Sequence, residues 1–301
     1  MSECESMYLY YFTQEKDFPF FIQDGHHDTP LKRHRHEDFV ELTIVLDGSA
    51  MQSVNEHSYY IKRGDVFVFG SDVTHQFFAT NKLHICNIMF RPEFIFEHAP
   101  DIRQIPGFHA LFIIEPLLAQ TSSYESYLQL NFHQFEQVRT LIHALYEEYH
   151  AHRPGRHTMA LSYFYQLATL LSRAYKLPQK EADNYSSFCI ARSVSYMEEN
   201  FRKDISIHQL AEMSHLSDRH FSRLFASVYH TSPHNYLMQL RLETACSLLE
   251  TAADNLSITE IALDCGFANN AYFSRLFRST YGMTPRQYRS LHTTLESLIP
   301  D

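Results

Sequence analysis

Cysteine is scarce in this sequence, and its placement argues against two common kinds of stabilisation. The chain has 301 residues and only five cysteines, an odd number with no C-x-x-C pair: Cys4, Cys86, Cys189, Cys246 and Cys265. A disulfide framework needs paired cysteines, and a structural zinc site usually needs closely spaced ones. The pattern is typical of a protein in a reducing cytoplasm.

Long apolar runs and signal-like segments are also missing. No stretch approaches 18 uninterrupted apolar residues, so we expect no membrane-spanning helix and no membrane partner. The first 21 residues mix four acidic residues with aromatic ones. They contain no basic region followed by an apolar run, so they do not predict a signal peptide.

Signatures of catalysis are absent as well. The sequence has no phosphate-binding glycine loop, no G-x-S-x-G motif and no pair of carboxylates in a recognisable catalytic context. We therefore expect no catalytic residues and predict that the protein is not an enzyme.

Positive charge is in short supply, and the deficit is uneven. The formal net charge is −10, from 25 Lys and Arg against 35 Asp and Glu. Residues 186–301 contain ten Lys and Arg and twelve Asp and Glu, a net charge of −2, so the preceding residues carry the remaining −8. The acidic part should not approach DNA phosphates. The near-neutral part can do so only if its arginines gather on one face.

The residues that are present divide the chain into two regions, which suits its length and its 45% content of hydrophobic residues. Segments rich in β-branched and aromatic residues predict strands at 39–46, 59–61, 66–69 and 83–90. Turn residues separate them at Asp47-Gly48, 63–65, 70–72 and Asn81. This spacing predicts an antiparallel barrel or sandwich over about residues 8–92.

Apolar residues then repeat every three to four positions, which predicts an antiparallel helix pair over about residues 133–176. The two runs lie on either side of Pro154-Gly155 and consist of Phe135, Val138, Leu141, Ile142, Leu145 and Tyr149, and of Phe164, Leu167, Leu171 and Ala174. Their stripe suits either a dimer face or packing on the barrel. We expect a first domain of residues 1–176, a polar linker at 177–187 and a second domain at 188–292.

The second domain contains an internal repeat. The sequence FSRLF at 221–225 recurs at 273–277, and YHTSP at 229–233 recurs as YGMTP at 281–285, both with an offset of 52. Upstream, the pattern I-x-x-L-A beginning at Ile207 recurs as I-x-x-I-A from Ile258, with an offset of 51. A repeat of this kind indicates a duplicated structural unit.

Each copy predicts a helix, a turn and a second helix. In the first copy the helices are expected at 207–213 and from Ser217, a capping residue, to Tyr229. In the second, the first helix is expected at 258–264, Gly266 occupies the turn and Asn269 caps the next helix. A helix at 233–251 would join the copies over about 28 Å, close to the roughly 34 Å between major grooves on one face of DNA.

This region resembles the AraC/XylS family of transcription regulators over about residues 194–289. The matching residues are Arg241-Leu242, Ala245, Leu248-Leu249, 258–262, Gly266-Phe267, 272–277, and Tyr281-Gly282, Pro285 and Tyr288-Arg289. His215 and His230 depart from the pattern, because the family usually has glycine there. The resemblance implies an all-α DNA-binding domain with two helix-turn-helix units.

The side chains expected to contact DNA lie on the second helix of each copy, away from its phenylalanines. They are Asp218, Arg219, Ser222, Arg223, Asn269, Asn270, Ala271, Ser274, Arg275 and Arg278. Arginine pairs with guanine and asparagine with adenine in the major groove. Arg223 and Arg275 recur at the same position, so each suits either a base or a phosphate contact. Arg278, His220 and Arg241 are candidates for phosphate contacts.

A histidine cluster is expected in the barrel. His34 and His36 alternate along one strand and share a face, and Glu41 and His75 can point towards them. Three imidazoles and a carboxylate suit a divalent transition metal. The spacing resembles the two motifs of cupin barrels, although the second motif lacks its proline and inner glycine. Four other histidines are expected to be solvated or structural: His26, His27, His57 and His84.

Regulators of the AraC/XylS family commonly carry an N-terminal cupin-like barrel that binds a small effector. Residues 38–90 look especially like the rhamnose-responsive members, through 39–42, 64–67, His75 and 87–93. The resemblance implies an α+β multidomain fold in which an antiparallel cupin-like barrel and a helical pair precede the DNA-binding domain. It assigns His34, His36, Glu41 and His75 to an effector, with a purely structural network as another possibility.

Three functions follow from these patterns. The first is an effector-controlled transcription regulator, an activator that senses a sugar. Its partners would be double-stranded DNA, the effector, RNA polymerase and a second copy of the chain. The second is a metal-binding cupin enzyme with an appended DNA-binding domain. The third is a constitutive dimeric regulator without an effector.

Overall fold

The computed structural model describes residues 4–55, 57–71, 73–96, 100–121, 128–177, 185–251 and 256–296. Contacts divide the chain into two compact units, Met1–Ser195 and Tyr196–Asp301. The division falls inside helix α6, Tyr185–Asn200. Most of the expected linker, residues 178–184, lies outside the described residues.

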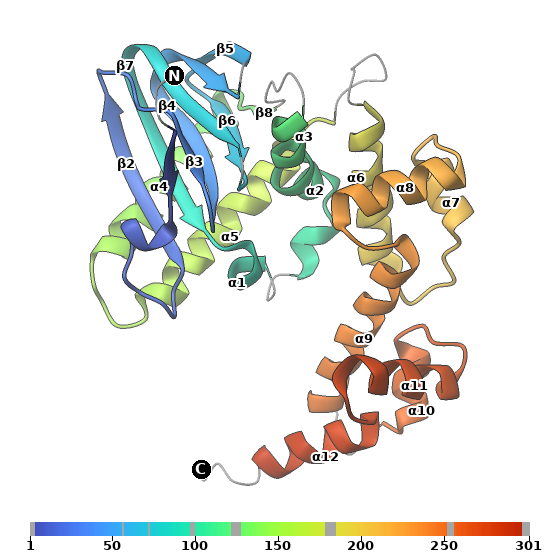
Figure 1. Ribbon diagram of the computed structural model, residues 1–301. Helices are drawn as coiled ribbons and strands as arrows, with labels where there is room; N and C mark the ends of the chain where they lie inside the picture. Colours follow the sequence, from blue (N-terminus) through green and yellow to red (C-terminus); the bar gives the residue numbers. More distant parts are fainter. Residues whose placement is uncertain are drawn as a thin grey trace. The chain divides into compact units, whose positions relative to one another are not determined.

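The first unit is built on one eight-stranded sheet with the strand order β1-β3-β7-β4-β6-β8, in which β2 also pairs with β7 and β5 with β4 (Figure 1). All pairs are antiparallel except β1 with β3. The strands are β1 Glu5–Met7, β2 Phe20–His27, β3 His34–His36, β4 Val40–Val54, β5 His57–Lys62, β6 Asp65–Phe69, β7 Thr74–Phe90 and β8 Leu128–Gln129. The predicted antiparallel β fold is confirmed.

Two of the expected turns are wrong. Asp47-Gly48 lies within β4 and Asn81 within β7, and the two strands stay paired across both positions. The register shifts three times between Val45 and Met51, so the pairing is irregular there but the chain does not reverse. Gly48 has a φ of +71°, and a Cβ there would lie 2.1 Å from the Lys82 carbonyl oxygen. The turn residues therefore allow an irregular pairing and a close approach between strands.

The sheet buries side chains on both faces. On one face, side chains from several strands pack against one another in an apolar cluster that includes Val45, Phe67, Phe69, Phe77 and Ile85. The other face lies against a helix pair, α4 Phe132–His150 and α5 Arg156–Ala174, in agreement with the helical periodicity (Figure 1).

The apolar stripe of the helix pair was expected either to form a dimer face or to pack on the barrel, and the contacts of the two helices favour packing. The ring of Phe20 lies 5.4 Å from that of Phe164, and Tyr149 donates its hydroxyl hydrogen to the Phe20 carbonyl oxygen at 3.0 Å. The stripe residues Val138, Leu145 and Leu167 are buried within the same unit. Packing on the sheet therefore accounts for the apolar stripe.

Short helices complete the first unit. They are η1 Leu9–Tyr11, α1 Pro92–Phe96, η2 Pro100–Gln104, α2 Pro106–His109, the π-helix η3 Ala110–Ile114 and α3 Glu115–Thr121.

The helices of the repeat follow the prediction to the residue or within one. They are α7 Ile207–Met213, α8 Asp218–Tyr229, α9 Pro233–Thr251, α10 Ile258–Asp264 and α11 Asn270–Tyr281. A further helix, α12 Pro285–Glu296, was not predicted. The side chains of Ser217 and Asn269 accept the backbone N–H bonds that cap α8 and α11. The small residues Ala211 and Ala262 are buried, which lets the paired helices pack closely. The expected helix-turn-helix units are confirmed.

His215 and His230 take left-handed backbone conformations, with φ of 55° and 54°. Gly266 and Gly282 hold the equivalent places in the second copy, with φ of 85° and 75°. The first helix-turn-helix copy therefore keeps the backbone of the second copy, although its histidine side chains disfavour that conformation.

We expect His215→Gly and His230→Gly each to raise the free energy of unfolding by about 0.5–1 kcal/mol, because glycine removes the left-handed strain. Urea denaturation followed by circular dichroism measures this. Gly282→Ala is the matched control, since its Cβ would meet nothing within 4 Å. It should lower the stability by about 1 kcal/mol. Loss of stability in both histidine variants would contradict the strain argument.

Candidate functional site

The second helix of each repeat presents an exposed polar face. The buried side of α8 contains Phe221 and Phe225, and that of α11 contains Phe273 and Phe277. The residues predicted to contact DNA are exposed or half-buried: Asp218, Arg219, Ser222, Arg223, Asn269, Asn270, Ala271, Ser274, Arg275 and Arg278. The structure thus leaves all ten accessible.

Three of these residues already have local partners. His208 Nδ1 donates to Asp218 Oδ1 at 3.0 Å, and Asn270 Nδ2 donates to Thr259 Oγ1 at 2.9 Å. These bonds join equivalent positions of the two repeats, from the first helix to the start of the second. Asn269 accepts the Tyr272 N–H as a cap. All three therefore help to set the angle or start of the recognition helix.

His208 and Thr259 are functional neighbours that the sequence reasoning missed. They occupy the same place in the two copies, as the offset of 51 shows. The pKa of His208 is raised, and the largest cause is its hydrogen bond to the Asp218 carboxylate. Aligning the repeats position by position would have identified the pair.

Arginines dominate the rest of this face. Arg223 and Arg275 are the sixth residues of α8 and α11, and both are exposed. Within the described part of the chain, Arg219, Arg223 and Arg278 form no ion pair. Arg275 lies over the Tyr272 ring at 5.8 Å. Their guanidinium groups therefore remain available to phosphates or to guanine.

Arg241 does not belong to this face, which corrects its place among the phosphate candidates. Its side chain is 8% exposed. It donates from Nε to the Phe201 carbonyl oxygen at 2.7 Å and from Nη2 to that of Lys203 at 2.8 Å. These carbonyls follow the end of α6, so Arg241 ties α9 to that segment.

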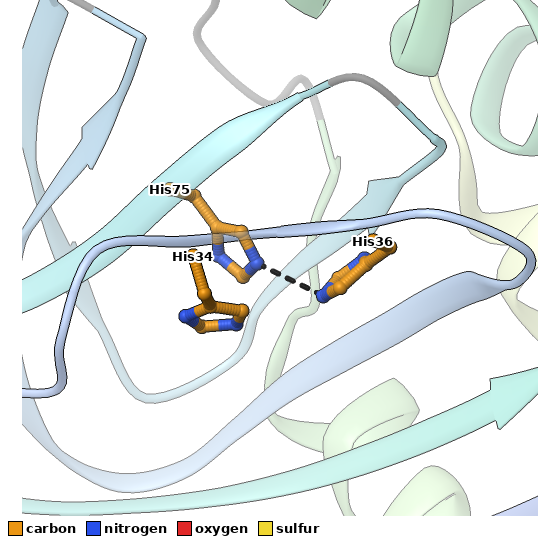
Figure 2. A group of neighbouring side chains, drawn as sticks. All are labelled: His34, His36 and His75. Atoms are coloured by element: carbon orange, nitrogen blue, oxygen red, sulfur yellow. Dashed lines mark hydrogen bonds between the residues drawn. The ribbon is translucent and has the colours of Figure 1, made fainter. Parts of the chain in front are cut away.

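The histidine cluster forms as predicted in the first unit (Figure 2). His34 and His36 come from β3, and His75 comes from β7, opposite His34 in the register. His36 Nε2 and His75 Nε2 lie 3.2 Å apart. Glu41, on β4, brings its oxygens to 3.7 Å from His36 Nε2 and 4.0 Å from His75 Nε2. All four predicted residues therefore meet.

Burial controls the protonation of this cluster. His36 and His75 are each 1% exposed and Glu41 is 2% exposed. Burial lowers the pKa of His36 to about 3 and holds the pKa of His75 well below its usual range. Burial also raises the pKa of Glu41 to about 7, against the opposing hydrogen bond from Thr43. The imidazoles are therefore neutral at pH 7, which is the form that binds a metal.

The donor set fits a divalent transition metal ion. Candidate ligand atoms of the three histidines all lie within 4.8 Å of one another. The 3.2 Å between the two Nε2 atoms is close to the roughly 3.3 Å expected for two nitrogens on a tetrahedral zinc ion. His34 Nδ1 donates to the Lys32 carbonyl oxygen at 2.9 Å, which leaves its Nε2 free.

Comparisons with known proteins support a cupin domain in the first region of the chain and a helix-turn-helix domain in the second. Residues 20–88 match the family model of the cupin domain, and residues 210–290 match that of a helix-turn-helix domain. The HTH-type transcriptional activator RhaR of Escherichia coli K12 is 28% identical over 272 residues, 90% of this chain and 92% of that protein. RhaR of Shigella dysenteriae is 27% identical over the same shares.

Two solved structures each match about a third of the chain. The DNA-binding domain of AdpA, determined in complex with a target DNA, is 28% identical, with a TM-score of 0.34, and covers 36% of this chain and 97% of that chain. An AraC-type regulator from Chromobacterium violaceum is 34% identical, with a TM-score of 0.32, and covers 35% of this chain and 91% of that chain.

The tandem helix-turn-helix units, the cupin domain and the similarity over 90% of the chain define a DNA-binding transcription regulator. The chain is similar to regulators of the AraC/XylS family in both of its regions. Among the helices that the structure describes, none combines the length and the apolar character needed to cross a bilayer.

Proposed function

We propose that this regulator is a transcription activator whose N-terminal domain senses a small effector, a sugar. The observation that carries the proposal is a cupin domain followed by two helix-turn-helix units, in a chain of which 90% matches the transcriptional activator RhaR. The activator works in the cytoplasm as a homodimer on double-stranded DNA and assists RNA polymerase. In this proposal residues 1–176 form the effector domain and 188–292 the DNA-binding domain, with the linker between them. Residues 185–187 of the expected linker already belong to helix α6.

The exposed face of α8 and α11 is the DNA-binding surface of this proposal. Arg219, Arg223, Arg275 and Arg278 supply positive charge there, although the net charge of the region is negative. Ser222, Ala271 and Ser274 lie between the arginines and offer small contacts to base edges. Asp218, Asn269 and Asn270 set the start of each helix.

For the histidine cluster, burial favours a metal ion over a sugar. A sugar needs a cavity of a few hundred Å³ that buries most of its surface. His36, His75 and Glu41 are almost fully covered by the protein and lie close enough to share one ion. A bound ion would link β3, β4 and β7. The proposal therefore assigns His34, His36, Glu41 and His75 to a metal and leaves the effector to another place.

Thermal unfolding against a panel of monosaccharides, beside a DNA shift assay on the region upstream of its own gene, tests the function. A sugar at 100 times its Kd should stabilise the domain it binds by about 2.7 kcal/mol. The same sugar should change the affinity for DNA. DNA binding that no sugar alters would leave a constitutive regulator, and turnover of a sugar by the metal-loaded protein would favour the cupin enzyme.

A further inference from the structure

A pocket of about 420 Å³ lies between α4 and the sheet, apart from the histidine cluster. Asp24, Asp47 and His84 line it from β2, β4 and β7, and Arg139 and His143 line it from α4. The size falls in the range of small-molecule sites. All the lining residues belong to the first unit.

The apolar lining comes from Leu46, Phe135, Ile142 and Tyr146. Phe135 and Ile142 are buried, whereas Tyr146 is half-buried. An aromatic or aliphatic surface beside polar groups suits a ligand with one apolar face and several polar substituents. The C–H face of a pyranose ring has this character.

The polar groups of the pocket are held in place by one another. His84 Nε2 and Asp24 Oδ1 form a short hydrogen bond, and the ring of His26 stacks on that of His84 at 3.9 Å. On the helix side, Glu136 binds Arg63 at 3.2 Å and Arg139 at 2.6 Å. The contact with Asp24 orients His84 before a ligand binds, whereas the two arginines are at least half exposed and are held only by a surface ion pair.

The charges of the pocket are nearly balanced. Among the lining residues, Asp24 and Asp47 oppose Arg63 and Arg139, and Glu136, which does not line the pocket, binds both arginines. The arginines donate hydrogen bonds and the carboxylates accept them. A ligand that both donates and accepts through several groups, without a net charge, matches this lining. An anion would face two carboxylates on the sheet side.

We propose that this pocket binds a neutral monosaccharide, which is the effector of the regulator. The inference rests on the proposed function and gives it a site outside the histidine cluster. A sugar held there bridges strands β2, β4 and β7 and helix α4. Its binding energy then bears directly on the packing of α4 and α5, and α5 ends at Ala174, just before the expected linker.

Calorimetric titration of the full chain with neutral aldohexoses and aldopentoses tests the site, with glucuronate as the charged counterpart. Asp47→Asn and Arg139→Gln replace exposed pocket residues and should preserve the fold. Asp17→Asn, at an exposed position that does not line the pocket, is the matched control. The unfolding midpoint of each variant without ligand verifies the fold.

We expect one neutral sugar to bind, and each pocket variant to weaken it at least tenfold while Asp17→Asn leaves Kd unchanged. Unchanged Kd in both pocket variants, or loss of binding in His34→Ala alone, would overturn the pocket and leave the sugar-sensing function intact. Binding of glucuronate but of no neutral sugar would overturn the ligand class. Binding of no sugar at all would overturn both proposals.

Discussion

Arg223→Ala and Arg275→Ala are each expected to weaken binding to the operator by about 5- to 150-fold. Both side chains are exposed on the second helix of a repeat and occupy its sixth position. Each substitution removes a guanidinium group that either pairs with guanine or neutralises a phosphate. Gel-shift titration of the upstream DNA at fixed salt concentration measures the change.

A second titration, with DNA of scrambled sequence, shows whether each arginine contacts a base or a phosphate. A base-contacting arginine loses affinity for the operator only, whereas a phosphate-contacting one loses affinity for both DNAs and lowers the salt slope by about one. Arg153→Ala is the matched control, because Arg153 is exposed in the first unit. If all three variants bound the operator like the parent, the proposed DNA surface would be wrong.

The double variant adds a test of the two-groove geometry. Helix α9, Pro233–Thr251, joins the repeats, and its 19 residues span about 28 Å. If the two recognition helices occupy separate grooves, the losses in binding free energy should add within about 0.5 kcal/mol. A double variant no weaker than the single ones would mean that only one unit reads the operator.

The helical repeat could be predicted almost to the residue because its signals are local. Ser217 and Asn269 cap the helices that follow them, and Gly266 takes the left-handed conformation that the turn requires. Buried phenylalanines alternate with exposed polar residues at helical spacing. His215 and His230 show the limit of this reasoning, because they adopt a glycine-like backbone without the residue type that signals it.

The strands of the sheet were harder to predict because pairing between residues far apart in the sequence determines where each strand begins and ends. Asp47-Gly48 and Asn81 have turn chemistry, yet a facing strand continues past each of them. Strand β2, Phe20–His27, was not among the predicted strands because its second half is polar and exposed. Arg241 is of a residue type that commonly binds phosphate, but it is buried and donates to a backbone carbonyl oxygen, which the sequence alone did not indicate.

Of the proposed sites, the histidine cluster was predictable and the sugar pocket was not. His34 and His36 are two residues apart on one strand, and the known motif supplies Glu41 and His75. The pocket combines side chains from β2, β4, β7 and α4, which no short pattern connects. His84, expected to be solvated or structural, lines that pocket and is hydrogen-bonded to Asp24.

Zinc or nickel ions are expected to raise the unfolding temperature of the N-terminal domain, and a chelator is expected to reverse the change. Neutral His36 and His75 approach each other at 3.2 Å, with Glu41 beside them, so an ion can replace the contact between them. An ion at 100 times its Kd adds about 2.7 kcal/mol, which corresponds to roughly 5–10 °C for a domain of this size. Differential scanning calorimetry of the full chain, with and without chelator, measures this shift.

His75→Ala should abolish the response to metal, because it removes one of the buried ligands. His26→Ala is the matched control, since Asp24, His26 and His84 form a second, exposed group with the spacing of a metal site. If the cluster binds the ion, His26→Ala keeps the full shift. Loss of the shift in His26→Ala but not in His75→Ala would move the metal to the exposed group. Without a shift in the parent protein, a hydrogen-bonded network of neutral histidines would explain the cluster.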